Sequence, residues 1–122
     1  MQRNSPVAEI EFLPETVQDA NDLSVELRRE IVRIVQELKS NPHIGELMSD
    51  KPPRNLKASR KIRFDLPEWR GKPRYRLVYR NEPDDGAVQT VAVLAIGVRD
   101  RMIAYAKASA RLKSRIAEEG LR

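Results

Sequence analysis

The sequence predicts a single α+β domain over residues 1–122, with elements in the order β-α-α-β-β-β-α. We expect a small, twisted, mostly antiparallel sheet, an N-terminal helical hairpin and a C-terminal helix. Three observations predict this class. Three short segments alternate apolar and polar residues, which is typical of half-buried strands. Leu23–Leu38 repeats apolar residues at spacings of three and four, as an amphipathic helix does. Val88–Ile96 is an almost unbroken apolar run, typical of a strand buried on both faces.

The first strand is predicted at Val7–Leu13, where apolar residues alternate with Glu9 and Glu11. Pro14 then suits the first turn of a helix. Thr16 and Asp19, three residues apart, resemble a capping arrangement for that helix.

The helical hairpin follows from a break at Asn21 and Asp22 in the otherwise helical pattern. The second helix carries one apolar stripe and is predicted to end at Asn41-Pro42, because proline restricts the residue before it. No clear period follows until Ser59, and Pro52-Pro53 indicates an extended connection.

The next two strands are predicted at Ser59–Asp65 and Arg74–Arg80. Each strand would carry apolar residues on one face and cations on the other. The segment between them, Leu66–Pro73, is too long and too rich in proline for a tight hairpin, and Asn81–Gly86 forms a second turn.

The buried strand is expected to end at Gly97, and the last helix to begin at about Asp100, a plausible N-cap. The predicted inward residues of that helix are Ile103, Ala106, Ala110, Leu112 and Ile116. We expect the N-terminal helical pair to cover one face of the sheet and the cations to occupy the other.

The basic charge is concentrated in thirty residues. The net charge is +5, yet residues 1–50 carry 5 Lys/Arg against 10 Asp/Glu, and residues 51–80 carry 11 against 2. Such a block attracts polyanions through counterion release and its long-range field. Nucleic acid is therefore the leading predicted partner and an acidic protein the second.

Composition excludes several classes of site. Without cysteine there is no disulfide, thiolate nucleophile or cysteine-ligated zinc, and one histidine, His43, cannot make a histidine-rich metal site. We expect no metal and no small-molecule cofactor. No apolar run approaches the roughly 20 residues of a membrane helix, so we expect a cytoplasmic protein without a membrane partner.

Antiparallel pairing would bring Lys61, Arg63 and Arg76 together, and the end of the buried strand adds Arg99. Tyr105 follows on the last helix. Guanidinium groups match phosphate in two-point contacts. RNA cleavage by a neighbouring 2′-hydroxyl requires removal of its proton, stabilisation of extra negative charge on phosphorus and protonation of the leaving 5′-oxygen. The cations could supply the second requirement. Such a site would be a poor nuclease on free RNA, so we expect another body to hold the RNA in line for attack.

Three segments carry a family resemblance. They are Lys61-Ile62-Arg63-Phe64, the strand Tyr75-Arg76-Leu77-Val78-Tyr79-Arg80, and the apolar strand that ends Gly97-Val98-Arg99-Asp100-Arg101, followed by Tyr105 and Ala108. Together they resemble the RelE/ParE toxin superfamily over nearly the whole chain, and its RelE branch most. The resemblance implies a metal-independent endoribonuclease that cleaves mRNA in the ribosomal A site, contacts ribosomal RNA and is inactivated by a cognate antitoxin.

The resemblance also implies roles for five residues. Lys61 and Arg63 match two basic strand positions, Arg76 the strand arginine, and Arg99 and Tyr105 the C-terminal arginine and tyrosine. Tyr105 would act as a general base or an orienting group, and Lys61 would share the proton transfer. Arg76 and Arg99 would stabilise the phosphorane, with support from Arg63. This chain departs from the family at Arg63, where lysine is common, and in its longer Leu66–Pro73 loop.

Further RNA contacts are predicted at flanking cations and one aromatic residue. These are Arg60, Arg74, Arg80, Arg101 and Trp69.

Each assignment has a structural alternative. Tyr105 could be a core-edge tyrosine, and Arg76 could pair with Glu9 or Glu11. Lys61 and Arg63 could simply face solvent, and Trp69 could pack rather than stack on a base.

Three functions stay open at this stage. The leading one is the ribosome-dependent endoribonuclease. The second is a ParE-like protein that inhibits DNA gyrase without catalysis, and the third is an inactive relative that only binds antitoxin or DNA. The antitoxin is expected to lay an acidic segment over the basic face or to displace the helix at Ala104–Arg122.

Overall fold

The computed structural model describes residues 7–49, 54–84 and 86–120. Five strands form one sheet in the order β1-β5-β4-β3-β2, in which only the β1–β5 pair is parallel. The elements are β1 (Glu9–Phe12), α1 (Pro14–Asn21), α2 (Val25–Ser40), β2 (Glu46–Leu47), η1 (Arg54–Leu56), β3 (Arg60–Phe64), β4 (Tyr75–Glu82), β5 (Thr90–Val98), η2 (Asp100–Met102) and α3 (Ile103–Gly120). This arrangement confirms the predicted α+β class and adds one short strand, β2.

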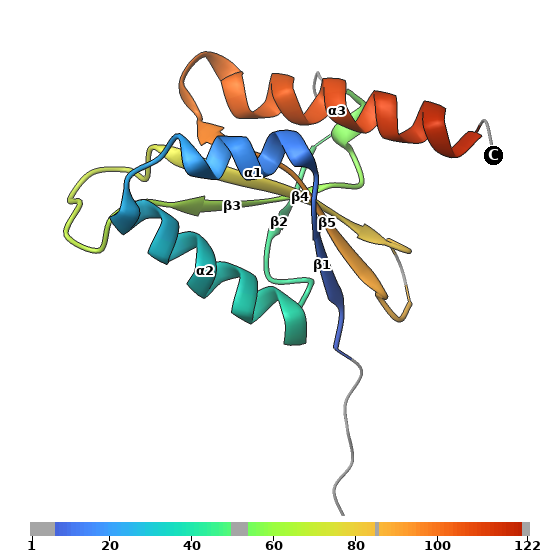
Figure 1. The fold of residues 1–122 in the computed structure, drawn as a ribbon, viewed down its shortest axis with the longest axis horizontal. Helices are drawn as coiled ribbons and strands as arrows, with labels where there is room; N and C mark the ends of the chain where they lie inside the picture. The colour runs from blue at the N-terminus through green and yellow to red at the C-terminus, as the bar shows by residue number, and fades with distance from the viewer. Residues whose placement is uncertain (1–6, 50–53, 85, 121–122) are drawn as a thin grey trace, which may run out of the picture.

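Two helices cover opposite faces of the sheet, with α3 above it and α2 below it in Figure 1. Leu27, Ile31, Ile34 and Leu38 of α2 pack on one face, against a cluster that includes Tyr79. The cluster on the other face joins Ala108 and Leu112 of α3 to Val78, Ala92 and Leu94. The prediction is correct in placing the cations on the face opposite α2, and wrong in leaving that face without a helix, because α3 covers part of it.

Helix α1 lies along the edge of β5 that β1 leaves open beyond Val93. The Thr16 hydroxyl lies 2.9 and 2.8 Å from the carbonyl oxygens of Val93 and Leu94, and donates to them. The Asp19 carboxylate accepts the Ile96 N–H at 3.0 Å. Thr16 and Asp19 therefore satisfy a strand edge. They do not form the predicted cap, since Leu13 occupies the N-cap position without a side-chain hydrogen bond.

A β-bulge in β5 changes which of its side chains face each helix. Val78 pairs with Ala95 and the next residue, Tyr79, pairs with Val93, so Leu94 is the extra residue. Leu94 and Ala95 both belong to the α3-side cluster, whereas Val93 and Ile96 belong to the α2-side cluster. The bulge therefore switches the alternation of β5 in its middle.

The segment from Pro42 to Ser59 contains more structure than expected. Glu46 and Leu47 pair with Lys61 and Arg60, although only two residues take part. Buried Tyr79 holds the preceding turn, because its hydroxyl donates to the Pro42 carbonyl at 2.8 Å and accepts the Gly45 N–H at 2.9 Å. The predicted extended connection at Pro52-Pro53 lies outside the described residues.

The inward face of α3 differs from the prediction. Ala104, Tyr105, Ala108 and Leu112 are buried, so Leu112 alone of the predicted inward residues is confirmed. Ile103 and Ile116 are exposed, as are Ala106 and Ala110. Small alanines allow the helix to approach the sheet closely. Tyr105 provides the large buried side chain that we expected from Ile103 and Ile116.

The start of α3 also differs from expectation. Asp100 does not cap the helix: a 3₁₀ turn, η2, occupies residues 100–102 and α3 begins at Ile103. Strand β5 runs one residue past Gly97. No helix in the described part of the chain is long and apolar enough to cross a membrane.

Candidate active site

A groove of about 990 Å³ opens on the α3 side of the sheet, beside the N-terminal end of α3. Its walls come from β3, β4, the end of β5, the η2 turn and the first turns of α3. The charged and polar residues that line it are Ser49, Lys61, Arg63, Lys72, Arg74, Arg76, Arg99, Asp100 and Tyr105. All five predicted catalytic residues therefore meet in one place.

Strand register explains why the cations gather. Arg63 of β3 lies directly opposite Arg76 of β4, and Arg76 lies opposite Gly97 of β5. Lys61 points to the same face as Arg63 because side chains alternate along a strand. Arg99 is fixed at the end of β5, where its N–H donates to the Arg74 carbonyl at 2.9 Å.

Arg76 and Tyr105 form the floor of the groove. Arg76 is 8% exposed and Tyr105 is 4% exposed. The Arg76 Nε donates to the Tyr105 hydroxyl at 3.2 Å, and its Nη1 donates to the carbonyls of Pro73 and Tyr75, each at 2.9 Å. Backbone contacts thus hold the guanidinium in a fixed orientation, with a phenol oxygen as its third partner.

Lys61, Arg63 and Arg99 line the more open part of the groove. The Lys61 Nζ lies 5.6 Å from the centroid of the Tyr105 ring, within range of a cation–π contact. Arg63 pairs with Glu46 at 3.3 Å, and both side chains are more than half exposed. Arg99 makes no ion pair with another described residue, so its guanidinium is available to an anion.

Arg74 is tied to its own loop. Its guanidinium donates to both Asp65 oxygens at 2.9 and 2.8 Å, and its backbone N–H donates to Asp65 at 2.9 Å. Hydrogen bonding from the Arg74 side chain lowers the pKa of Asp65 to about 2. The Arg74 guanidinium also lies 3.5 Å from the centroid of the Trp69 ring.

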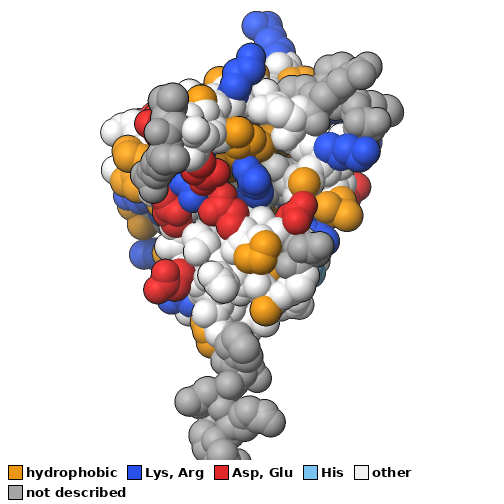
Figure 2. Space-filling view, turned by 90° about the vertical axis from the view of Figure 1, so that its right-hand side faces the viewer, with side chains coloured by type: hydrophobic (Ala, Val, Ile, Leu, Met, Phe, Trp, Pro, Cys, Tyr) orange, Lys and Arg blue, Asp and Glu red, His pale blue; other side chains and the backbone are white. Residues whose placement is uncertain are grey.

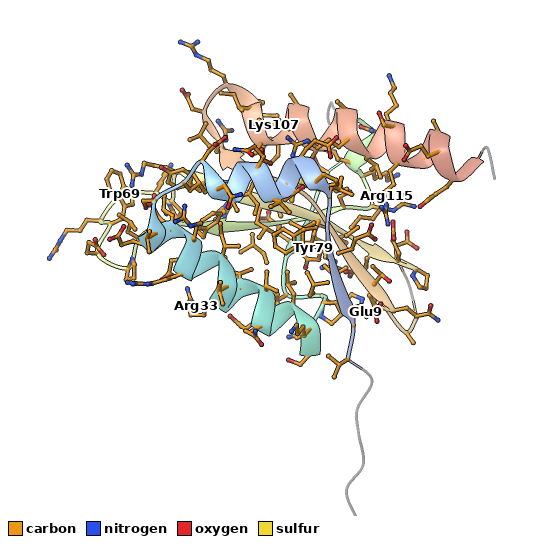
Figure 3. The ribbon with its side chains drawn as sticks, viewed as in Figure 1. Glu9, Arg33, Trp69, Tyr79, Lys107 and Arg115 are labelled. Atoms are coloured by element: carbon orange, nitrogen blue, oxygen red, sulfur yellow. The ribbon has the colours of Figure 1, made fainter. Side chains whose placement is uncertain are left out.

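Trp69 faces away from the groove. It lines a second hollow of about 360 Å³ between α2 and the Leu66–Pro73 loop, and its indole N–H donates to the Lys72 carbonyl at 3.1 Å. In Figure 3 it lies at the end of the molecule formed by this loop. The packing alternative for Trp69 is the one that these contacts support.

Besides Trp69, three predicted RNA contacts are not part of the groove lining. Arg60 points to the α2 side and donates to the carbonyls of His43 and Gly45 at 3.1 and 2.7 Å. Arg80 lies four residues beyond Arg76 on β4, and Arg101 lies exposed on η2. Alternation predicted the faces of Lys61 and Arg63 correctly, and it places Arg60 on the opposite face from them.

The predicted alternative for Arg76, an ion pair with Glu9 or Glu11, is wrong. Glu11 instead pairs with Arg115 at 2.8 Å, and Arg115 also reaches Glu82 at 2.8 Å. This pairing occurs at the far end of α3 from Trp69 (Figure 3). Figure 2 views the molecule from that side and shows acidic and basic side chains mixed on the surface.

Lys72 and Asp100 line the groove without having been predicted as site residues. Lys72 stands in the proline-rich loop, whose path the sequence does not define. Asp100 was interpreted as a helix cap. The signal that could have identified it is its position between Arg99 and Arg101, at the end of the buried strand.

The arrangement is suited to an anion with several oxygens. Cations from β3, β4 and β5 converge on one open groove, and Arg76 has its orientation fixed by the backbone. Such pre-organised donors stabilise negative charge that develops during a reaction. Within the described residues, no group of three or more His, Asp or Glu side chains is placed to hold a metal ion.

Comparison with known proteins gives a consistent result for the fold. The sequence matches no family model and no curated protein. A double arginine-to-alanine variant of the E. coli toxin RelE in the free state matches with a TM-score of 0.63 and 20% identity, over 86% of this chain and 97% of that one. The chain has the RelE fold.

Two toxin–antitoxin complexes match the RelE fold of this chain as well. The RelBE2 complex of Mycobacterium tuberculosis has a TM-score of 0.55 and 23% identity, over 76% of this chain and 99% of that one. The intact E. coli RelBE complex has a TM-score of 0.55 and 21% identity, over 77% and 99%. These likenesses establish the RelE fold.

Proposed function

We propose that the chain is the toxin of a type II toxin–antitoxin system and acts as a ribosome-dependent mRNA endoribonuclease. The observation that carries the proposal is the convergence of Lys61, Arg63, Arg76, Arg99 and Tyr105 in one groove. Two of the solved structures with the same fold are complexes of toxin with antitoxin, which supports the assignment of a protein partner.

The proposed reaction needs no metal ion. The 2′-hydroxyl of one nucleotide gives up its proton to a base in the groove as its oxygen attacks the adjacent phosphorus, and the bond from phosphorus to the 5′-oxygen breaks. Arg76 and Arg99 would stabilise the additional negative charge, with Arg63 in support. Tyr105, whose oxygen accepts the Arg76 N–H, would direct its own proton to a phosphate oxygen. Lys61 would protonate the leaving 5′-oxygen.

Dependence on the ribosome follows from the residue types. Arginines stabilise charge but do not place the 2′-oxygen in line with the bond that breaks, and the groove is open to solvent. Holding the reacting groups in line supplies a large part of the rate in such reactions. The ribosomal A site would supply this constraint, and ribosomal RNA would meet the exposed cations.

The antitoxin would act on the same surface. An acidic segment over the groove would neutralise its cations, and displacement of α3 would remove Tyr105 from Arg76. Both routes would inactivate the site.

The test is to map the 5′ ends of an mRNA incubated with the protein, with and without ribosomes stalled on it. We expect cuts that require ribosomes and fall inside codons. Tyr105→Phe and Arg99→Ala should reduce the cleavage rate by about 10²-fold or more, the range for loss of a pre-organised donor. Arg29→Ala, on the exposed side of α2, is the control and should cleave normally. Growth arrest without cuts in either reaction would contradict the proposal and would direct attention to inhibition of DNA gyrase.

A further inference from the structure

Asp100 lines the same groove as the catalytic cations, and it is the one acidic residue among the described residues that line it. We infer that its carboxylate is the general base that removes the proton from the attacking 2′-hydroxyl. This inference rests on the proposed function. It assigns removal of the 2′-hydroxyl proton, a step for which the sequence analysis proposed no carboxylate.

The other charged residues among the described lining of the groove are all cations. They are Lys61 and Arg63 from β3, Lys72 and Arg74 from the loop before β4, Arg76 from β4, and Arg99, which follows β5. The other nearby acids are engaged: Asp65 pairs with Arg74 at 2.8 Å and Glu46 pairs with Arg63 at 3.3 Å. Asp100 makes no ion pair with any described residue, so its oxygens are available to a substrate hydroxyl.

The alternative bases are less suitable. The Tyr105 oxygen already accepts the Arg76 N–H, and its ring is buried. An ammonium group has no lone pair with which to accept a proton, whereas a carboxylate oxygen can accept one. The Lys61 ammonium lies 5.6 Å from the centroid of the Tyr105 ring, within the groove, where it can serve as a proton donor.

Two residues with left-handed backbone conformation follow Asp100 and help to place it at the groove. Arg101 and Met102 have φ values of 55° and 60°, in the left-handed region that residues other than glycine rarely occupy. Asp100 and Met102 line the groove, whereas Arg101 between them does not. Strained backbone of this kind persists only where the surrounding structure enforces it, and it concentrates at functional sites.

The proton transfers balance. Asp100 takes the 2′-hydroxyl proton, the 2′-oxygen forms its bond to phosphorus, and the 5′-oxygen leaves with a proton from Lys61. The products are a 2′,3′-cyclic phosphate and a 5′-hydroxyl. Asp100 then releases its proton to water and Lys61 takes one up.

The experiment measures single-turnover cleavage of mRNA in stalled ribosomes between pH 6 and 8 for the wild type, Asp100→Asn, Asp100→Glu and Glu118→Gln. Asn keeps the size of the side chain but removes the base. We expect Asp100→Asn to lower the rate by about 10²–10⁴-fold, the usual contribution of a general base. Asp100→Glu should retain a substantial part of the rate. Glu118→Gln makes the same charge change on an exposed position of α3 and should cleave like the wild type.

The pH profile separates this role from a structural or electrostatic one. The wild-type rate should vary less with pH over this range than the rate of Asp100→Asn. The residual rate of Asp100→Asn should rise about tenfold per pH unit as hydroxide replaces the base. Half-saturation and melting temperature should change little. Asp100→Asn cleavage within threefold of the wild type, or a slow variant with a flat profile, would overturn the inference while the proposed nuclease stands. A wild type that cuts no mRNA would overturn both.

Discussion

Asp65 shows how a single carboxylate can close a long loop. It accepts the backbone N–H of Leu66 at one end of the Leu66–Pro73 segment and that of Arg74 at the other. The Arg74 guanidinium binds both of its oxygens and stacks on Trp69. These contacts fix the Leu66–Pro73 loop, whose conformation the sequence does not predict, beside the groove. Lys72 and Pro73 thereby become part of the groove wall.

The first prediction concerns the pH dependence of this contact. Arg74 lowers the Asp65 pKa to about 2 in the folded protein, below the value of about 3.9 for an unfolded chain. The stabilisation is therefore complete above pH 5 and is lost as the pH falls from 4 to 2. Asp65→Asn should reduce the free energy of unfolding by about 1 kcal/mol at pH 6, and the difference from wild type should shrink toward pH 2 in denaturant titrations.

The matched control for Asp65 is Glu68→Gln, an exposed residue of the same loop. Its unfolding free energy should follow that of the wild type across the whole range. A difference between Asp65→Asn and wild type that does not vary with pH would contradict the assigned pKa.

The second prediction concerns Gly45. A Cβ at this position would lie 2.7 Å from both Cε1 and the hydroxyl oxygen of Tyr79, which is fully buried. Gly45→Ala must therefore move the turn and weaken the hydrogen bond from its N–H to Tyr79. We expect a loss of about 1–3 kcal/mol in thermal or denaturant unfolding. Gly120→Ala, where a Cβ would meet no atom within 4 Å, should be neutral, and equal effects of the two substitutions would refute this interpretation.

Residue-level reasoning predicted part of the site well. Alternation alone places Lys61, Arg63 and Arg76 on one face, because side-chain direction in a strand depends only on parity. Asp100 was assigned differently because its role depends on two left-handed residues that follow it. Neither Arg101 nor Met102 is a residue type that signals such a conformation.

At the scale of elements, α3 is held to the sheet by a buried ion pair as well as by apolar contacts. Asp19 of α1 is 5% exposed at its side chain and pairs with Arg111 of α3 at 2.6 Å and with Lys107 at 3.2 Å. Arg111 also donates to the Leu94 carbonyl at 2.9 Å. Burial alone would raise the Asp19 pKa, but the hydrogen bonds from Arg111 and Ile96 outweigh it and the pKa is lowered. Three elements thus meet at one carboxylate.

The third prediction follows from that pair. Asp19→Ala leaves Arg111 largely buried without its counter-charge, and should cost about 3 kcal/mol in unfolding free energy. Hydrogen exchange should increase along α3. Glu15→Gln, exposed on the same helix, should change stability by less than about 0.5 kcal/mol. The double variant Asp19→Ala/Arg111→Met should recover part of the loss, and a fully additive loss would contradict the unpaired-charge explanation.

Sequence patterns predicted which elements exist better than how they pack. The stripe of α2 and the apolar run of β5 define their own buried faces. For α3, the predicted inward residues were mostly wrong, because side chains of distant segments help to orient this helix: Asp19 accepts hydrogen bonds from Lys107 and Arg111. The short strand β2 has two residues and depends on pairing with β3, so it leaves no periodic signal.

For the molecule as a whole, the groove concentrates positive charge that is only partly compensated. Six cations line it, and two of them, Arg63 and Arg74, have carboxylate partners. At the opposite end, Arg115 is shared between Glu11 and Glu82. RNA should therefore approach from the groove side.

The fourth prediction is the salt dependence of RNA binding. Each phosphate neutralised by a cation contributes about −0.7 to the slope of log affinity against log salt for a single strand. Four uncompensated cations predict a slope of about −3, measured by fluorescence anisotropy with an RNA oligomer. Lys61→Ala should make the slope less steep by about 0.7. Lys113→Ala, exposed on α3, should leave it unchanged, and identical slopes for all three proteins would show that the groove is not the RNA-binding surface.

The edge of β5 beyond Val93 has a consequence for self-association. Where β1 ends, the carbonyls of Val93 and Leu94 and the N–H of Ile96 are taken up by Thr16 and Asp19. Helix α1 therefore occupies the place where another chain could add a strand, and the strand it shields is the most apolar in the protein. A substitution that detaches α1 would consequently expose an unpaired edge of β5. A moderate loss of stability would then lead to aggregation through pairing of this edge with another chain.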